Sequence, residues 1–555
     1  MRGARQSRQL SSLRSSSACL IITHGSGSPD ASGSGARGAC LRQCLYQFRQ
    51  EVYMSSFLSI FAFMLYAVVL VILFAFGINF LYLAIVTLRQ EQSDPAAPPM
   101  PEMPRVSVQV PIFNELYVAE RLIDAVARFE WDAARLEILV LDDSTDETRD
   151  IVQKTVERWQ AQGINIQHVQ RADRTGFKAG ALALGMSLTD APYIAYFDAD
   201  FVPPRDFLLK TIPHFANEKI AFIQTRWGHL NRNYSLLTFL QSLAIDAHFV
   251  VEQYARSRGN FWFNFNGTAG VWRRAAIENA GGWKQDTLTE DLDLSYRAFL
   301  KGWSALYLRE VVTPAELPVT FSAYQRQQHR WAKGSLECAI KLLPQVWHAP
   351  ISLGKKLEAS FHLTGYSIHL YMFVLMLLYP FIVYYSNYFP ELMALYGIGV
   401  LFNLSALAPT MYFTLAQKEL GGGWWRKFPA ILFMMAFGAG MMTTTVRAAT
   451  ELLTGRGKSF ERTPKFGVSS NREAWVSKKY QLQLDPWILF QIAVLVWCAN
   501  TLIYCYYMRN WIIGIYAGII FIGVLFVTLM GLAQNFQVRQ YRKKQAVSPS
   551  MPAQA

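Results

Sequence analysis

The sequence contains few charged residues for its length. Charged side chains make up 17% of its 555 residues, whereas hydrophobic ones make up 52%. This composition excludes an ordinary soluble protein and indicates membrane segments. The formal net charge is nevertheless +13. In so apolar a chain, we assign the excess cations to loops beside anionic lipid and expect no nucleic-acid partner.

Cysteine is scarce, and common nucleotide-binding motifs are missing. The six cysteines form no C-x-x-C pair and no Cys/His cluster, which supports neither a zinc site nor a disulfide framework. The Gly- and Lys-containing segment RTGFKAGAL (174–182) lacks the spacing of a P-loop. No G-x-G-x-x-G segment follows a predicted strand, so a dinucleotide-dependent oxidoreductase is unsupported.

Acidic residues are nearly missing from the first 53 residues, which hold seven Arg and ten Ser against two acids. Such a head is typical of a transit peptide, but it also fits a misplaced start with Met54 as the first residue. We favour the second interpretation, because a membrane-type sequence begins directly at Met54.

Long apolar runs mark the membrane part of the chain. If all the later runs crossed the bilayer, the central region and the basic C-terminal tail would face opposite sides. The run at 428–447 has Trp residues and cations before it and a basic segment after it, as expected for a helix lying in the interface. We therefore predict that it does not span. The apolar runs are 57–88, 363–384, 393–416, 428–447, 486–507 and 511–533.

Three predicted strands in the central region end in carboxylates. Apolar runs alternate there with helical segments, which predicts an α/β fold with a mostly parallel sheet covered on both faces. Ligands bind beyond the carboxyl ends of the strands in such sheets, so we expect the acids to surround one crevice. The carboxylates are those of Glu115, Asp142, Asp143, Asp198 and Asp200.

The acids of the DAD step, Asp198 and Asp200, would repel each other unless a cation joined them. Mg²⁺ and Mn²⁺ accept one or two carboxylates and complete their shells with water and phosphate oxygens. The alternative is that the acids merely end strands and face water. Two acid pairs at two strand ends, with Lys178 between them in the sequence, favour a metal-bound nucleotide diphosphate.

Two later segments supply further candidates. Glu290 and Asp291 begin a predicted helix, where acids ordinarily complement the helix dipole. A carboxylate on a rigid element beside the crevice is also suited to take a proton from a sugar hydroxyl. In AYQRQQHRWAKGS (323–335), an amide, a guanidinium able to bind phosphate and a ring able to stack on a sugar come from Gln327, Arg330 and Trp331.

These motifs occur in a familiar order. DDSTD, DAD, TED and QQHRW, flanked by apolar runs, resemble the motifs of family-2 glycosyltransferases that polymerise β-linked glycans. FNGTAGVWR, AGGW, EDLDL and LKGW make the chain most similar to cellulose-synthase-like mannan and glucomannan synthases and to bacterial cellulose synthase catalytic subunits. The resemblance covers about residues 57–535. It implies a GT-A-type nucleotide-sugar domain flanked by transmembrane helices.

The resemblance also implies residue roles. Asp291 would be the general base, with Glu290 beside it, and Asp198 and Asp200 would hold Mg²⁺ or Mn²⁺. The donor nucleotide would contact Glu115, Asp142, Asp143, Lys178 and Asp198. The diphosphate and the acceptor would contact Asn266, Gly267, Thr268, Gln327, Arg330 and Trp331. The segment 457–465 falls where processive synthases keep a gating loop, but its sequence departs from the bacterial pattern, which leaves that role open.

The predicted function is inverting transfer of a hexose from UDP-glucose or GDP-mannose to a growing β-glycan that is exported, with a slight preference for UDP-glucose. A glycolipid-forming single transfer is the alternative enzyme, and a non-catalytic transporter or scaffold is the alternative without chemistry. The expected partners are the nucleotide sugar, a polysaccharide or lipid acceptor, and membrane lipid. Because the tail after the last apolar run is short, we expect no cyclic-dinucleotide-binding domain like that of bacterial cellulose synthases in this chain.

The predicted layout places the catalytic domain in the cytoplasm of a bacterium, beneath its plasma membrane. Its parts are a non-native head (1–53), a transmembrane helix (54–92), the GT-A domain (100–350), two transmembrane helices (355–418), an interfacial helix with a basic loop (424–480), two transmembrane helices (484–534) and a basic tail (535–555).

Overall fold

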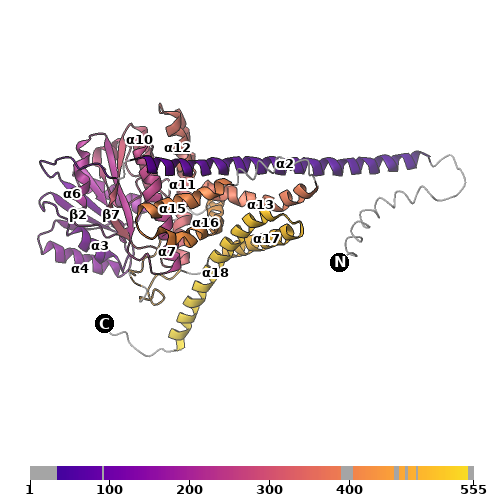
Figure 1. Ribbon diagram of the computed structural model, residues 1–555. Helices are drawn as coiled ribbons and strands as arrows, with labels where there is room; N and C mark the ends of the chain where they lie inside the picture. The colour runs from indigo at the N-terminus through magenta and orange to yellow at the C-terminus, as the bar shows by residue number, and fades with distance from the viewer. Residues whose placement is uncertain are drawn as a thin grey trace.

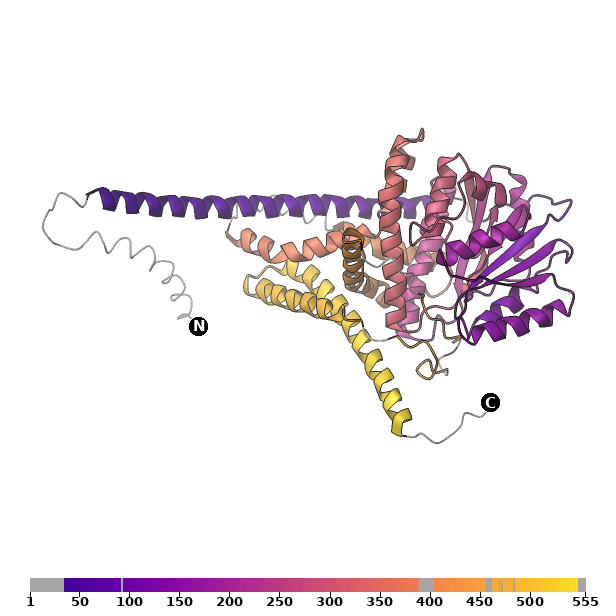
Figure 2. The ribbon, with the colours of Figure 1, turned by 180° about the vertical axis from the view of Figure 1, so that it is seen from behind.

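A sheet domain lies at one end of the molecule, and long helices extend from it (Figures 1 and 2). The computed structural model describes residues 34–90, 93–388, 404–455, 462–468, 470, 473–482 and 485–547. Part of the predicted head, of the run at 393–416 and of the segment 457–465 therefore lies outside the described residues.

The sheet has seven strands in the order β3-β2-β1-β4-β6-β5-β7. Only β6 runs antiparallel to its neighbours, and the other neighbouring pairs are parallel. The carboxyl ends of six strands therefore meet at one edge. The strands are β1 (Val106–Ile112), β2 (Leu136–Asp142), β3 (Ile166–Gln170), β4 (Tyr193–Tyr196), β5 (Ile220–His229), β6 (Gly270–Arg273) and β7 (Ser304–Ala315).

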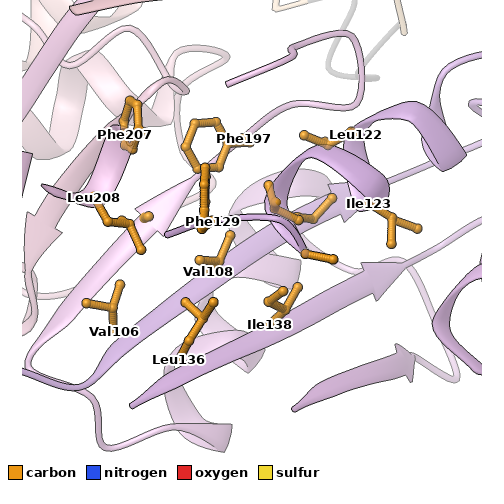
Figure 3. Packing of buried hydrophobic residues seen from close by; sticks show 14 of the residues in the cluster. Val106, Val108, Leu122, Ile123, Phe129, Leu136, Ile138, Phe197, Phe207 and Leu208 are labelled. Carbon is orange, nitrogen blue, oxygen red and sulfur yellow. The ribbon is translucent and has the colours of Figure 1, made fainter. Parts of the chain in front are cut away.

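Apolar side chains cover both faces of this sheet. Val108 and Ile138 lie opposite each other on β1 and β2 and pack with Leu122 and Phe129, as Figure 3 shows. The alternate residues of β2, such as Leu139, belong to a second cluster on the other face. Burial on both faces explains the near-continuous apolar runs of these strands. The predicted α/β fold with a mostly parallel sheet is confirmed.

Helices form the two outer layers. One face carries α3 (Ala119–Val126), α4 (Thr148–Gln160), α6 (Phe207–Thr211) and the 3₁₀ turn η1 (Ile212–Ala216). The other carries α5 (Phe177–Leu188), the π-helix η2 (His248–Gln253), α8 (Tyr254–Arg258), α9 (Arg274–Asn279), α10 (Glu290–Leu300), α11 (Phe321–His348) and α12 (Leu353–Leu363). The helix α7 (Leu236–Ala247) joins this layer to the membrane helices.

Five helices in the described chain are long and apolar enough to cross a membrane. They extend away from the sheet domain or pack beside it (Figure 1). They are α2 (Ser34–Arg89), α13 (Ser367–Tyr388), α16 (Trp424–Leu453), α17 (Ile488–Tyr507) and α18 (Trp511–Val547). The described end of the predicted span 393–416 forms the turn η4 (Leu404–Leu407) and the short helix α15 (Ala408–Glu419).

The helix α16, which we predicted to lie in the interface, is long and apolar enough to cross a membrane. In its most apolar window 61% of residues are buried, against 33–39% for the other four candidates. It crosses α18 so closely that a Cβ on Gly440 would lie 2.4 Å from the carbonyl oxygen of Gly523. Small residues permit such crossings between membrane helices. Aromatic and basic residues also flank spanning helices, so our signal did not separate the two placements; the interfacial placement stays a prediction.

Candidate active site

Acidic residues follow four strands at the carboxyl edge of the sheet. Glu115 follows β1, Asp143 follows β2, and Asp198 and Asp200 follow β4. Glu316 follows β7 in the same way. All five line one pocket of about 190 Å³, which we call the donor pocket. The parallel topology thus gathers the carboxylates as the sequence predicted.

The DAD turn carries two lysine contacts. Lys178 Nζ lies 2.6 Å from Asp198 Oδ1 and also donates to the carbonyl of Gly267 at 2.8 Å. Lys465 Nζ lies 2.6 Å from Asp200 Oδ2. Both carboxylates are therefore neutralised by ammonium groups, so their proximity does not depend on a metal alone. Thr268 is buried, and its hydroxyl accepts from the Asp198 amide, so it supports the turn from outside the pocket.

Asp142 and Asp143 point in different directions. Asp142 is buried, and its carboxylate contacts His168 Nε2 at 2.9 Å and the Ser144 amide at 2.9 Å. Burial opposes its ionisation, but the hydrogen bonds from His168 and Ser144 outweigh it and lower the pKa of Asp142. We expected Asp142 to contact the nucleotide, whereas here it holds the turn. Asp143 lines the pocket and pairs with Arg171.

A segment from the C-terminal half, residues 462–468, lies across the donor pocket. Arg462 Nη1 is 3.5 Å from Glu115 Oε2, and Lys465 also donates to the carbonyl of Glu316 at 2.8 Å. The next amide, that of Phe466, donates to the carboxylate of Glu316 at 2.9 Å. Burial is the main cause that raises the pKa of Glu115 to about 8, although Arg462 opposes it. We call residues 462–468 the strap.

The catalytic candidate Asp291 lies at the first turn of α10, beside Gly267. A Cβ on Gly267 would lie 3.1 Å from Asp291 Oδ2 and 3.3 Å from Lys178 Nζ, so a glycine lets the backbone approach both groups. Burial and the neighbouring carboxylate of Glu290 raise the pKa of Asp291 to about 7, against the opposing charge of Lys178. A base with a pKa near neutrality suits proton abstraction at physiological pH.

A second cavity, of about 610 Å³, adjoins the donor pocket, and we call it the inner cavity. Side chains of the membrane helices line it, including Leu73 of α2, Tyr379 of α13 and Ile520 of α18. Asp291 and Trp331 line both the inner cavity and the donor pocket. The base candidate therefore lies at the junction of the two spaces.

The structure brings together all but two of the predicted site residues. Those lining the donor pocket are Glu115, Asp143, Lys178, Asp198, Asp200, Asn266, Gly267, Glu290, Asp291, Gln327, Arg330 and Trp331. Asp142 and Thr268 both belong to the described part of the chain, but they do not line the donor pocket. The arrangement supports the predicted roles without testing them.

Sequence reasoning missed several residues of the pocket. Glu316 follows an apolar strand, the same signal that identified the other acids, and could have been found. Arg462 and Lys465 could not have been found in this way, because no sequence pattern near them predicts contact with strands more than 100 residues earlier. Arg174, which lies over the ring of Phe113 at 3.3 Å, opens the segment RTGFKAGAL noted above, but the sequence assigned a role there only to Lys178.

The side chains at the DAD turn supply some, but not all, of the ligands that a hard divalent cation needs. Asp198 and Asp200 supply carboxylate oxygens, which Mg²⁺ and Mn²⁺ prefer. Within the described chain, no three acidic, His or Cys side chains converge as a metal site. An ion at the DAD turn would therefore need ligands from water and from a diphosphate, as Mg²⁺ commonly does.

Comparison with known proteins identifies the domain. Residues 104–334 match the family described as Glycosyltransferase like family 2. The chain carries a family-2 glycosyltransferase domain. The predicted GT-A-type fold agrees with this assignment, since the matched range contains the whole seven-stranded sheet and the start of α11.

The relatives share a common name. The chain is 43% identical to glucomannan 4-β-mannosyltransferase 9 of Arabidopsis thaliana, over 46% of this chain and 50% of the relative. It is 42% identical to glucomannan 4-β-mannosyltransferase 1 of Oryza sativa subsp. japonica, over 49% and 55%. The chain thus spans about half the length of the curated relatives it matches. These relatives are plant proteins, so the bacterial plasma membrane stays a prediction.

Among solved structures, a mannosyltransferase from Pyrobaculum calidifontis in complex with GDP-Man and Mn²⁺ is similar at 18% identity and a TM-score of 0.46. That match covers 71% of this chain and all of the other.

Proposed function

We propose that this protein is an inverting membrane glycosyltransferase that extends a β-linked glycan processively and passes it into the inner cavity for export. The relatives named glucomannan 4-β-mannosyltransferases favour mannose from GDP-mannose as the transferred sugar. This changes the slight preference for UDP-glucose that the motifs alone supported, and UDP-glucose remains the second donor.

One observation carries the proposal: Asp291 lines both the donor pocket and the inner cavity. A base must touch the acceptor hydroxyl while the donor's anomeric carbon lies within reach. A growing chain held in the inner cavity would present its terminal hydroxyl at this junction. Trp331, which lines both spaces, supplies a ring on which the terminal sugar can stack.

The transfer is a single displacement at the anomeric carbon, and each residue of the site has a separate role in it. Asp291 takes the proton of the acceptor hydroxyl while the hydroxyl oxygen forms a bond to the anomeric carbon. The bond from that carbon to the diphosphate breaks, and the electron pair leaves with the diphosphate. Lys178 and Arg330 line the pocket and stabilise the negative charge of the leaving group. A divalent ion bound by Asp198 and Asp200 would supply further charge stabilisation.

The strap contributes Arg462, Thr463 and Lys465 to the lining of the donor pocket. Its Arg462 and Lys465 pair with pocket carboxylates, so the strap carries positive charge to the place where a nucleotide diphosphate would bind. This position supports the gating role that the sequence left open for the segment 457–465, of which residues 462–465 are described.

A labelled-donor assay tests the function. The full chain, reconstituted in lipid, is incubated with labelled GDP-mannose or UDP-glucose, and the product is sized and digested with linkage-specific hydrolases. We expect a high-molecular-weight polymer cleaved by a β-mannanase. A single labelled sugar attached to lipid would favour the glycolipid alternative, and no turnover of either donor would refute the proposal.

A further inference from the structure

A polar network runs along one side of the inner cavity, and the proposed reaction does not use it. His248 Nδ1 lies 2.9 Å from Glu252 Oε2, and Arg256 Nη2 lies 3.2 Å from Glu252 Oε1. The other ring nitrogen of the histidine, His248 Nε2, lies 3.1 Å from the side-chain amide nitrogen of Asn266. Asn266 is the neighbour of Gly267, which packs against the base candidate Asp291.

These contacts fix the hydrogen-bonding roles of the histidine. A carboxylate only accepts, so Nδ1 of His248 carries the proton that faces Glu252. Nε2 then accepts from the amide nitrogen of Asn266. The amide oxygen of Asn266 in turn accepts from Gln253 at 2.5 Å. Glu252 therefore orients His248, and His248 orients the Asn266 amide at the junction of the two spaces.

The two ends of the network differ in exposure. The side chains of His248 and Glu252 are 29% and 21% exposed, and both line the inner cavity. The side chains of Arg256 and Glu358, farther along, are 2% and 7% exposed. Arg256 also lines the inner cavity, but the side chains of His248 and Glu252 are the more exposed part of the network.

The local backbone also sets this end apart. His248 and Glu252 lie on the π-helical segment η2, between α7 and α8. Single π turns inside helices occur frequently at functional sites.

Glu252 is ionised: burial opposes this, but His248 and Arg256 lower the pKa of Glu252 below its usual range. A carboxylate offers about four acceptor positions, and His248, Arg256 and Tyr412 occupy three of them.

We propose that His248 and Glu252 form an acceptor subsite that binds hydroxyl groups of the glycan just behind its growing end. This inference rests on the proposed function and deepens it, because it names a polyhydroxylated sugar chain as the occupant. Glu252 and Asn266 line the inner cavity, and the fourth acceptor position of Glu252 and the second N–H of the Asn266 side chain can pair with ring hydroxyls, while His248 holds both groups in place. The acyl chain of a lipid would offer no partner to the fourth acceptor position of Glu252 or to the second N–H of the Asn266 side chain, and hydrogen bonds left unmade at partly buried polar groups are costly.

The test separates acceptor binding from donor chemistry. The full chain in lipid is given labelled GDP-mannose with increasing β-1,4-linked mannohexaose, and donor hydrolysis is measured separately without any acceptor. The variants are His248→Phe, which removes both hydrogen bonds, and Glu252→Gln, which keeps the size but removes the charge. His214→Phe is the matched control, since His214 is a buried histidine that lines neither cavity.

We expect the half-saturating mannohexaose concentration to rise about fivefold for His248→Phe and roughly tenfold or more for Glu252→Gln. Donor hydrolysis, which needs no glycan, should change much less than the acceptor dependence, and what change there is would pass through Asn266, which also lines the donor pocket. His248→Gln, which keeps one donor and one acceptor, should recover part of the loss.

Unchanged acceptor dependence in both variants overturns the subsite while leaving the proposed function intact. A parallel fall in hydrolysis and elongation also overturns it, because that pattern marks a structural role. A wild-type protein that turns over neither GDP-mannose nor UDP-glucose refutes the proposed function itself, and the subsite with it.

Discussion

The most informative perturbation is at Asp291, because its raised pKa predicts a pH profile. With a pKa of about 7, half of the carboxyl groups are ionised at pH 7, about a tenth at pH 6 and about a hundredth at pH 5. Only the ionised form can act as a base. We therefore expect kcat/KM to fall about tenfold per pH unit below pH 7. A carboxyl with the ordinary pKa of 3.8 would stay ionised across this range.

The same shift predicts an effect on stability. Between the ordinary pKa and the raised one, the unfolded chain has lost the proton while the folded protein retains it, so stability falls as pH rises from about 4 to about 7. A rise of about three units corresponds to about 4 kcal/mol, and we expect roughly half of it because the carboxyl faces a cavity. Asp291→Asn should thus be more stable than the wild type at pH 8 and equal to it at pH 4.

The assay combines initial rates from pH 5 to 8 with thermal denaturation of both proteins. Glu290→Gln is the control: it removes a charge that raises the pKa of Asp291, so the acid limb of the profile should move to lower pH. A wild-type profile flat down to pH 5, or wild-type-like transfer by Asp291→Asn, would refute the reasoning.

Three further predictions concern the donor pocket. Gly267→Ala should lower the transfer rate at least tenfold and destabilise the protein by about 1–2 kcal/mol, because φ is +76° and the new Cβ would crowd Asp291; an unchanged rate in a stably folded variant would contradict the close approach. Lys465→Met should lower the half-saturating Mn²⁺ concentration severalfold, since Asp200 would no longer have to leave an ammonium group; a Mn²⁺ titration that matches the wild type would argue against this competition. Removing divalent ions with EDTA should abolish transfer, and Mg²⁺ or Mn²⁺ should restore it; full activity in EDTA would exclude a metal requirement.

Much of the fold could be predicted, because its signals are local. Apolar runs such as that of β1, ending at Ile112, specify buried parallel strands, and the acids that follow mark their carboxyl ends. The burial of Asp142 could not be predicted from the same pattern. The direction in which the Asp142 side chain points depends on its contact with His168, which lies on the neighbouring strand β3.

The sequence by itself determined that strands would end in acids at one edge and that apolar helices would flank the domain, since both depend on periodicity and composition along short stretches. Only the tertiary structure decided which acids face a cavity, because side-chain partners come from distant segments. Lys465, for example, contacts Asp200, which lies 265 positions earlier in the chain. Glu252 and His248 are close in sequence, but only the tertiary structure shows that both line the inner cavity. Packing among the membrane helices creates that cavity, and no local pattern encodes it.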